Sequence, residues 1–314
     1  MTRSSHTSLR GGPEFDAVRA LLARWGDAAR DVGDDAAVLE LPRGDSLVAS
    51  VDATIEQHHF RQGWLTPREI GYRAAVAAVS DLAAMAATPR AMLVALALPD
   101  HWRRDIDAIA DGLGEAALEY AIPIVGGNIT AASELSLTLT VLGTARDAVR
   151  RAGLGAGDSL WVTGMLGGPG AALRALVNGS DPAPDHRERF ARPRARVHEA
   201  RWLAAEGVTA GIDVSDGLAS DLAQLAAASG VVIEVELERL PLARGVTAEQ
   251  ALESGEEYEL IVGSRGDLDV AAFRERFGIP LTRIGRAHRG SADVVLTRAG
   301  ARVANPPGYD HLSR

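Results

Sequence analysis

Apolar residues recur with two different periods along the chain, and each period predicts one kind of secondary structure. Val18, Leu21 and Trp25 follow the spacing of one helical face, which predicts a helix over residues 16–25. Residues 135–141 instead alternate apolar and polar side chains, which predicts a strand with one covered face and one polar face.

The longest helical pattern begins at a capping box and carries one carboxylate on its apolar side. Thr66 is followed by Pro67 and then by Glu69, an arrangement typical of a helix N-terminus, so we expect a helix from Pro67 to about residue 87. The carboxylate of Asp81 falls on the buried stripe of this helix. The other members of the stripe are Ile70, Ala74, Ala77 and Ala78.

The rest of the chain alternates predicted strands with predicted helices, which indicates an α/β (α+β) protein. Strands are expected at residues 36–41, 46–51, 92–98, 159–163, 211–214, 231–237, 258–262, 282–287 and 294–297. Helices are expected at residues 104–120 and 171–177, and from Ser215 as the N-cap to a stop at Gly230. Residues 178–194 are polar and rich in proline, so we expect a loop there.

A segment rich in arginine, glycine and alanine, residues 146–157, separates two halves that share this α/β pattern. We therefore expect two domains, residues 14–147 and residues 148–314, which agrees with the length of the chain. Residues 1–13 contain arginines but no apolar core of a signal peptide, so a disordered tail is expected there.

Composition excludes several classes of protein and of site. The chain has a net charge of −9 and no basic stripe, so no nucleic-acid binding is expected. Its longest apolar run, residues 92–99, is shorter than the ~20 residues of a membrane span. The lack of cysteine excludes disulfides and thiolate chemistry and agrees with a cytoplasmic protein. All 33 Lys and Arg positions are arginine, so a nucleotide site cannot contain a Walker A lysine or a kinase-type lysine.

Aspartates stand at strand ends, in a glycine turn and on an alanine-rich helix face. Burying several carboxylates costs free energy unless cations neutralise them, so the set predicts a site for hard divalent metals and phosphates. The alternatives are local: a helix N-cap with first-turn acids at residues 213–216, an arginine partner for Asp81, and a simple turn after Gly33. The aspartates are Asp34, Asp35, Asp52, Asp81, Asp213 and Asp216.

Three further signals are less specific. The glycine-rich segment 164–170 would bring backbone amides together, either to meet a phosphate or only to form a tight turn. Asn128 follows an apolar stretch at a predicted strand end, where its amide would either bind a metal or fix a turn. His58 and His59 have no second histidine pair at helical spacing, so zinc is not expected.

Seven motifs occur in an order that is far more specific than any one of them. They are Glu14-Phe15, Gly33-Asp34-Asp35-Ala36-Ala37-Val38-Leu39, residues 50–60, Ser80-Asp81-Leu82-Ala83-Ala84-Met85, Ile212-Asp213-Val214-Ser215-Asp216-Gly217-Leu218, Gly255-Glu256-Glu257-Tyr258-Glu259-Leu260 and Gly308-Tyr309-Asp310-His311. On these motifs the chain resembles the thiamine-monophosphate kinases, a family of the aminoimidazole-ribotide-synthetase-like superfamily, over nearly its whole length. The resemblance implies a two-domain fold in which an N-terminal mixed sheet with helices forms the core of a homodimer, followed by a C-terminal α/β domain.

The resemblance also implies ATP-dependent phosphorylation of thiamine monophosphate to thiamine diphosphate by direct in-line transfer, with no residue assigned as a general base. ATP would be the co-substrate, and several Mg²⁺ ions would be the cofactors. By motif position the magnesium ligands would be Asp35, Ser50, Val51 through its carbonyl, Asp52, Asp81, Asn128, Asp213 and Asp216. The ATP contacts would be Gly127, Asn128, Arg151 and Ser215, and the thiamine phosphate contacts would be His59, Glu256 and Tyr309.

The chain departs from the family pattern at three of its site motifs. The family's Gly-Gly-Asp-Thr-Thr reads Gly126-Gly127-Asn128-Ile129-Thr130, which replaces an expected metal carboxylate by a neutral amide. The family's Gly-Gly-Glu-Asp-Tyr reads Ser254-Gly255-Glu256-Glu257-Tyr258, and the Thr that usually follows the strand-end aspartate is Ala53. Two alternatives follow: a diverged paralogue that uses ATP on a different small acceptor, and a nucleotide-binding regulator without turnover. The retained aspartates argue against the regulator, because buried acids are costly to keep.

Overall fold

The computed structural model of the protein describes residues 13–30, 37 and 39–306. The chain forms two compact units, one comprising Met1–Leu82 and Ala87–Asp147, the other Ala83–Ala86 and Ala148–Arg314. We call them the N-terminal and the C-terminal unit and describe each by itself. Among the described residues, no helix combines the length and the apolar character needed to cross a membrane.

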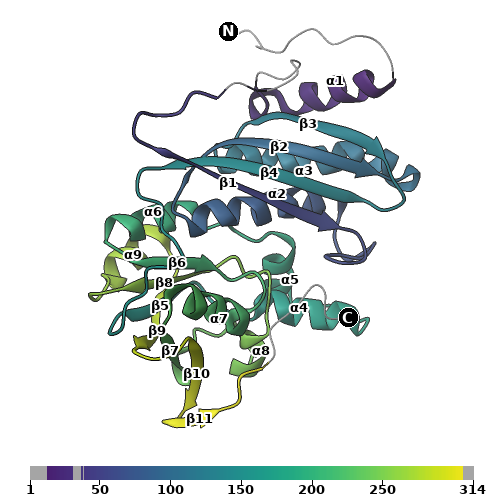
Figure 1. The fold of residues 1–314 in the computed structure, drawn as a ribbon. Helices are drawn as coiled ribbons and strands as arrows, with labels where there is room; N and C mark the ends of the chain where they lie inside the picture. Colours follow the sequence, from purple (N-terminus) through teal and green to yellow (C-terminus); the bar gives the residue numbers. More distant parts are fainter. Residues whose placement is uncertain (1–12, 31–36, 38, 307–314) are drawn as a thin grey trace. The chain divides into compact units, whose positions relative to one another are not determined.

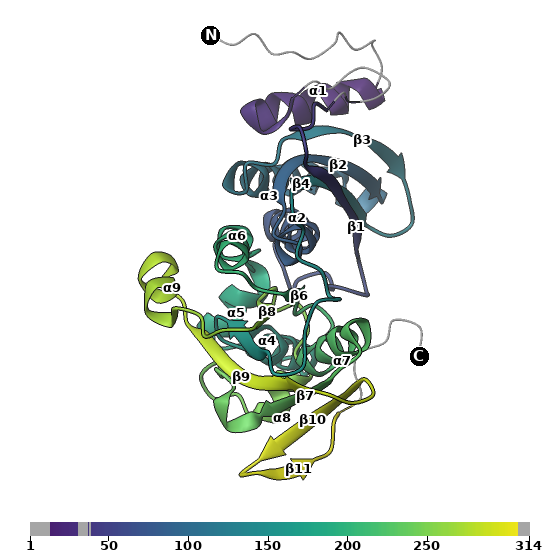
Figure 2. The ribbon, with the colours of Figure 1, turned by 60° about the vertical axis from the view of Figure 1, so that its left-hand side comes forward.

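The N-terminal unit contains a mixed sheet with helices along one of its faces (Figures 1 and 2). The sheet has the order β1-β4-β2-β3, in which β4 is antiparallel to both neighbours and β3 is parallel to β2. The elements in chain order are α1 (Pro13–Trp25), η1 (Gly26–Ala28), β1 (Ser46–Ile55), α2 (Pro67–Ala84), β2 (Thr88–Leu98), η2 (Asp100–Asp105), α3 (Ile106–Glu119), β3 (Ile124–Ala131) and β4 (Ser136–Ala145).

Helix α2 has the predicted start and buried face. The Glu69 backbone N–H donates to Thr66 Oγ1 at 3.2 Å and the Thr66 N–H donates to Glu69 Oε2 at 2.7 Å, so the capping box is confirmed. Ile70 and the alanines of the stripe are buried. The helix ends three residues earlier than expected, because Ala86 adopts a φ of 53° and the chain turns into β2.

Strands β1, β2 and β4 of the N-terminal unit are longer than the sequence pattern predicted, and one predicted strand is missing from its described residues. Strand β1 continues past Asp52, because its pairing with β4 extends to Ile55 opposite Ser136. Asn128 likewise lies inside β3 and not at a strand end. Of the strand expected at 36–41, Ala37 and residues 39–41 lie in no strand, and the remainder is outside the described residues.

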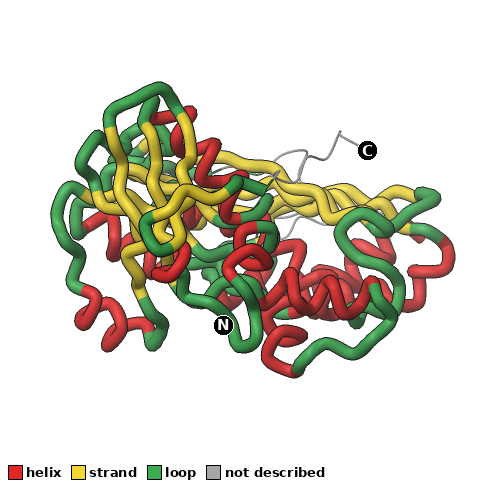
Figure 3. Tube along the Cα trace, turned by 90° about the horizontal axis from the view of Figure 1, so that it is seen from below, coloured by secondary structure: helices red, strands yellow, loops and turns green. Residues whose placement is uncertain are grey.

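The C-terminal unit is built on a second, larger mixed sheet. Its strand order is β11-β10-β7-β9-β5-β8-β6, with one parallel pair, β10 and β7, and antiparallel pairs elsewhere among the described strands. The elements are β5 (Ser159–Thr163), α4 (Gly168–Val177), α5 (Pro184–Ala191), α6 (Val197–Ala205), β6 (Ala210–Asp213), α7 (Leu218–Ser229), β7 (Val232–Glu236), η3 (Leu237–Arg239), α8 (Ala248–Leu252), β8 (Leu260–Ser264), α9 (Val270–Phe277), β9 (Leu281–His288), β10 (Asp293–Arg298) and β11 (Ala301–Val303). In Figure 3 the strands, in yellow, gather into sheets with helices, in red, beside them.

The α/β (α+β) fold class is confirmed, but three local predictions in the C-terminal unit are wrong. The expected loop at 178–194 contains α5, which has proline in its first turn and buries Phe190. Ser215 does not cap α7; the helix begins at Leu218 with Gly217 as N-cap and no side-chain cap. Helix α4 starts at Gly168, so part of the glycine-rich segment is helical. The stop of α7 at Gly230, with a φ of 67°, is confirmed.

Candidate functional site

In the N-terminal unit, a strand and a helix bring a hydroxyl and a carboxylate together. Ser50 and Asp52 alternate along β1, opposite the buried residues Val141 and Leu139 of β4, so their side chains share the helix-covered face of the sheet. The Ser50 hydroxyl donates to Asp81 Oδ2 on α2. Val51 lies between them on the other face, where its side chain is 62% exposed.

Asn128 and Gly127 lie elsewhere in this unit. They belong to β3, and β4 and β2 separate this edge strand from β1, a distance of about 14 Å between the outer strands. Asn128 pairs in register with the exposed Ala95, on the face opposite Ser50 and Asp52. A Cβ on Gly127 would approach Val94 O to 1.9 Å, so only glycine fits at this strand contact. Within one chain the structure does not bring Asn128 together with Asp52 or Asp81.

His59 is fixed in the tight turn that follows β1. The Ile55 N–H donates to His59 Nδ1 at 3.1 Å, which orients the imidazole and assigns its acceptor nitrogen. Arg73 Nη1 donates to the His59 carbonyl at 3.4 Å. The side chain of Phe60 is buried, and its carbonyl accepts the Gln57 N–H at 2.7 Å, which closes the turn. The histidine is therefore held by its own turn, in a defined orientation.

In the C-terminal unit, the segment after β6 carries a group of three carboxyls. Asp213 is buried at the strand end and Asp216 follows in the turn. The third is Asp221 of α7, which is 1% exposed and was not predicted from the sequence. Its Oδ2 accepts the N–H groups of Ser215 at 3.1 Å and of Asp216 at 3.2 Å, so it fixes the turn.

The pKa of Asp221 is strongly raised in this group. Burial, and then the negative charges of Asp213 and Asp216, together raise it from 3.8 to about 8, although the N–H groups of Ser215 and Asp216 act in the opposite direction. Mutual repulsion of this kind is relieved when a cation binds among the carboxylates. Positive charge beside Asp213 and Asp216 would therefore favour the ionised form of these carboxyls.

Gln224 connects two of the predicted site residues. Arg151 Nη1 donates to Gln224 Oε1 at 2.6 Å, and Gln224 Nε2 donates to Asp216 Oδ2 at 3.3 Å and to Asp221 Oδ1 at 3.4 Å. The sequence reasoning missed Gln224 because a glutamine on a helix is usually only a solvated residue. The signal for Asp221 was present, because it falls at helical spacing from the buried Leu218, Leu222 and Leu225.

The loop of residues 254–259 lies directly beside the turn at 213–216. The Glu256 N–H donates to Ser215 O at 2.7 Å and the Tyr258 N–H donates to Val214 O at 2.9 Å, while the Val214 N–H donates to Glu259 O at 2.8 Å. These bonds extend the antiparallel pairing of β6 with β8. The structure thus brings Glu256 beside Ser215, both predicted site residues.

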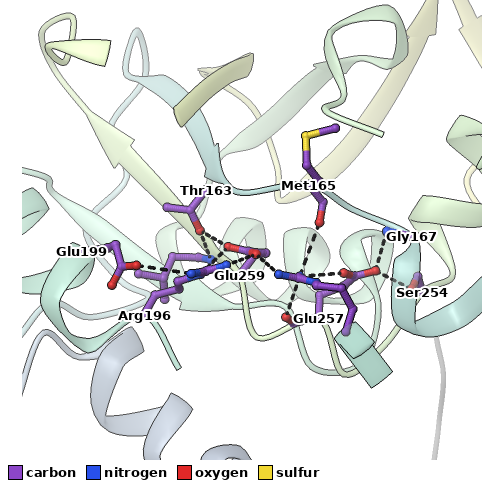
Figure 4. Close-up of polar contacts among 10 residues, drawn as sticks. Thr163, Met165, Gly167, Arg196, Glu199, Ser254, Glu257 and Glu259 are labelled. Atoms are coloured by element: carbon purple, nitrogen blue, oxygen red, sulfur yellow. Dashed lines mark hydrogen bonds and ion pairs between the residues drawn. The ribbon is translucent and has the colours of Figure 1, made fainter. Parts of the chain in front are cut away.

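Two glutamates of this loop, Glu257 and Glu259, have buried side chains (Figure 4). Arg196 binds Glu259 through two nitrogens, at 2.8 and 2.6 Å, and Thr163 donates to the same carboxylate at 2.7 Å. Burial opposes ionisation of Glu259, but the charges of Arg196 and Arg189 hold its pKa below the usual range. Burial raises the pKa of Glu257 to about 7.

The glycine-rich segment 164–170 uses its amides within the protein. The Gly167 N–H donates to Glu257 Oε1 at 2.5 Å, and the Gly170 N–H donates to Ser254 Oγ at 3.0 Å. A Cβ on Gly164, which has a φ of 63°, would approach Glu259 Oε1 to 2.2 Å. These contacts favour the tight-turn interpretation over a phosphate site at Gly167 and Gly170.

Magnesium fits the donors that the structure presents, although the described residues contain no group of three or more His, Asp or Glu side chains arranged to hold a metal ion. Mg²⁺ usually binds through one or two carboxylates together with substrate phosphates and water. Asp81 with the Ser50 hydroxyl, and Asp213 with Asp216, are oxygen donors of this kind. Asp35 and Tyr309, two further predicted site residues, lie outside the described residues.

Two family descriptions match consecutive parts of the chain. They are AIR synthase related protein, N-terminal domain, at residues 33–145, and AIR synthase related protein, C-terminal domain, at residues 155–297. The chain is also 31% identical over 323 residues to the thiamine-monophosphate kinase of Bacillus subtilis (strain 168), which covers 95% of this chain and 99% of that protein.

Two solved structures are also similar to this chain along most of its length. The crystal structure of thiamine-monophosphate kinase from Stenotrophomonas maltophilia K279a has a TM-score of 0.79 and 32% identity, and the match covers 92% of this chain and 96% of that chain. A structure described as AaThiL complexed with AMPPCP and TMP has a TM-score of 0.76 and 28% identity, with 97% and 99% coverage. These matches confirm the resemblance found from the sequence motifs. The chain therefore belongs to the thiamine-monophosphate kinase family.

Proposed function

We propose that this chain transfers the γ-phosphoryl group of ATP to the phosphate of thiamine monophosphate, giving thiamine diphosphate and ADP. The observation that carries this proposal is the full-length likeness to thiamine-monophosphate kinases, including the structure with TMP and the ATP analogue AMPPCP. The alternative of a diverged paralogue with another acceptor is not favoured, because the full-length relatives carry the name of this one activity.

The reaction requires positioning and charge neutralisation more than proton transfer. The accepting phosphate oxygen of thiamine monophosphate is already anionic, so no general base is needed and none is assigned. Direct in-line transfer needs the two phosphates held end to end in one orientation. The residues that fix Glu256 and the turn at 213–216 serve this requirement.

Bound magnesium would supply positive charge to the phosphate oxygens. We propose that the N-terminal unit holds magnesium through Ser50, Asp52 and Asp81, and the C-terminal unit through Asp213 and Asp216. The hydrogen bond from Ser50 to Asp81 and the fixed turn at Ser215 support this assignment, because both keep ligand oxygens in place before the ion arrives. By the family motifs, Asp35 and the Val51 carbonyl belong to the same set, and Asn128 to a weaker position.

Arginine takes the part that lysine has in other nucleotide sites. We propose that Arg151 meets the ATP phosphates, with its guanidinium oriented by Gln224, and that Ser215, Gly127 and Asn128 meet other parts of the nucleotide. A guanidinium presents several N–H donors in a planar fork that suits phosphate oxygens. For this nucleotide, Arg151 with Gln224 is the part of the assignment with the clearest structural support.

We propose that thiamine monophosphate contacts His59, Glu256 and Tyr309. His59 is held by the Ile55 N–H and Glu256 by its bond to Ser215, so both side chains project from fixed backbone. Fixed side chains bind a ligand with less loss of conformational entropy. Tyr309 is assigned from its motif alone.

We also propose that the protein is a cytoplasmic homodimer. The sheet face of the N-terminal unit that carries Leu47 and Val51 leaves these side chains 50% and 62% exposed, although leucine and valine are usually buried. A second copy placed against this face would cover them. The proposed use of ATP as co-substrate supports the cytoplasmic location. Light scattering of the purified protein tests the dimer.

The experiment that tests the function is an assay with ATP, Mg²⁺ and thiamine monophosphate, in which thiamine diphosphate and ADP are separated and quantified. We expect equal amounts of both products, and none after removal of Mg²⁺ with a chelator. Asp213→Asn is the negative control for the site, and the exposed Asp181→Asn is its matched control. Binding of ATP without thiamine diphosphate formation contradicts the proposal.

A further inference from the structure

The 254–259 loop is held in a conformation that its side chains do not favour. Glu256 has a φ of 55° and Tyr258 a φ of 53°, both in the left-handed region that favours glycine. Such conformations persist only where the surrounding contacts determine them. The contacts of this loop therefore determine where the Glu256 carboxylate lies.

One side of the loop is fixed by backbone bonds to the turn at 213–216, and the other side is fixed by Arg189 of α5. Arg189 Nη1 donates to Glu259 Oε1 at 2.8 Å. Its Nη2 lies 3.4 Å from Glu257 Oε2 and 3.3 Å from the Glu257 carbonyl oxygen. One guanidinium thus binds both buried carboxylates and the main chain between them.

The contact of Arg189 with the Glu257 carbonyl restrains the backbone conformation of the loop. The Glu257 carbonyl belongs to the peptide that joins Glu257 to Tyr258, and the orientation of this peptide plane sets the φ of Tyr258. A donor on that oxygen opposes rotation of the plane towards the commoner conformations. Arg189 Nη2 also lies 3.5 Å from Met165 O in the glycine-rich segment. The guanidinium therefore ties the loop to the base of that segment.

Arg196, the other arginine at the buried glutamates, has a different role from Arg189. It binds Glu259 and Glu199 through their carboxylates, and Glu259 lies at the start of the regular sheet, one residue before β8. Without Arg189, the Glu259 carboxylate keeps Arg196 and Thr163 as partners, whereas the peptide of Glu257 and Tyr258 loses its side-chain donor. The two arginines are thus separable: Arg196 stabilises the buried charge and Arg189 orients the loop.

We propose that Arg189 is a positioning residue that sets the orientation of Glu256 towards thiamine monophosphate. This inference rests on the proposed function, because it requires that Glu256 contacts that substrate. Arg189 acts through the loop backbone and does not itself touch either substrate. Its effect is therefore specific to one of the two substrates.

The test compares Arg189→Gln and Arg189→Lys with the wild-type protein, and uses Arg194→Gln, a nearby exposed arginine, as the matched control. We expect the glutamine variant to raise KM for thiamine monophosphate by about tenfold or more, with KM for ATP changed less than about twofold. The lysine variant keeps the positive charge but has a single donor nitrogen, so its KM should lie between those of the wild type and the glutamine variant. Titration calorimetry with thiamine monophosphate gives the same ranking without turnover.

A purely structural role predicts a different result. Loss of folded protein lowers kcat for both substrates and leaves both KM values unchanged, and circular dichroism measures the folded fraction. If the glutamine variant does not fold, the lysine variant provides the test by itself. An unchanged KM for thiamine monophosphate, or an equal rise of both KM values, overturns the inference while the proposed function stands. Wild-type protein that neither binds nor phosphorylates thiamine monophosphate overturns both.

Discussion

The Ser254 hydroxyl donates to Glu257 Oε1, and both side chains also accept a backbone N–H from the glycine-rich segment, from Gly170 and Gly167 respectively. These are the two positions at which the 254–258 motif departs from the family pattern. Because they contact each other, the two departures form one structural change. The pair anchors the loop that carries Glu256 without placing a new group in the site.

Substitution of Ser254 or of Glu257 should lower the free energy of unfolding. The double substitution should lower it by less than the sum of the two single effects. Ser254→Ala leaves the Gly170 N–H without its acceptor and removes one of the donors to Glu257, so we expect a loss of about 1–2 kcal/mol. A double-mutant cycle with Glu257→Gln, measured by chemical unfolding, should give a coupling of about 1 kcal/mol. The control is Ser180→Ala, at an exposed serine three residues after the end of α4. Strict additivity would contradict the pairing.

Stability in the absence of metal should fall as the pH rises from about 4 to about 8. The pKa of Asp221 is raised to about 8 in the folded protein, so the folded state keeps a proton that the unfolded chain releases near pH 3.8. The unfolded state then binds fewer protons, and the free energy of unfolding decreases with rising pH in this window. Glu257, with its pKa raised to about 7, contributes with the same sign.

Asp221→Asn removes the larger part of this dependence. We expect the melting temperature of the variant, measured with a chelator present, to change less between pH 5 and 8 than that of the wild type. The exposed Asp181→Asn should keep the wild-type profile. Parallel profiles for all three proteins would show that Asp221 does not hold a proton in the folded state.

Asp81→Asn should separate metal binding from stability. The amide can still accept the Ser50 hydroxyl, and an uncharged group on an apolar helix face is less costly to bury, so the melting temperature should not fall. The lost charge should lower kcat by about 100-fold and raise the Mg²⁺ concentration for half-maximal activity. A titration of activity with Mg²⁺ measures both. An unchanged titration would exclude Asp81 from the metal site.

Asn128→Asp should lower the Mg²⁺ concentration needed for activity, because it restores the carboxylate expected at this family position. Asn178→Asp, at the exposed end of α4, adds the same charge elsewhere and should have no effect. No change in the magnesium titration of Asn128→Asp would mean that the amide has no metal role. The position of Asn128, on the strand edge and face away from Asp52, makes this the most informative of the metal variants.

Local signals predicted much of the fold. The capping box at Thr66, the alanine stripe of α2 and the glycine stop of α7 depend on residues close together in the chain, and the structure has all three. Strand ends were less predictable, because they depend on pairing with distant strands. Asp52 looked like a strand end, but the register with β4 extends β1 by three more residues.

The same distinction applies to the site. The acidic motifs could be found in the sequence because each places a carboxylate at a strand end, in a glycine turn or on an apolar helix face, where its burial costs free energy. The roles of Gln224 and Arg189 could not be predicted, because their partners are distant in the sequence. Gln224 binds Arg151, 73 residues away, and Arg189 binds Glu257 and Glu259, 68 and 70 residues away. The segment around Arg189 was expected to be a loop, because its helix α5 is short and polar and only Phe190 and Ala191 are buried.

The left-handed backbone at Glu256 places stability and function in opposition at one position. Glycine adopts a φ of 55° freely, so Glu256→Gly should relieve strain of about 1 kcal/mol while it removes the carboxylate proposed to meet thiamine monophosphate. We expect a melting temperature equal to or above that of the wild type, with a much higher KM for that substrate. A screen for thermal stability alone would therefore retain Glu256→Gly, although this variant should have lost activity.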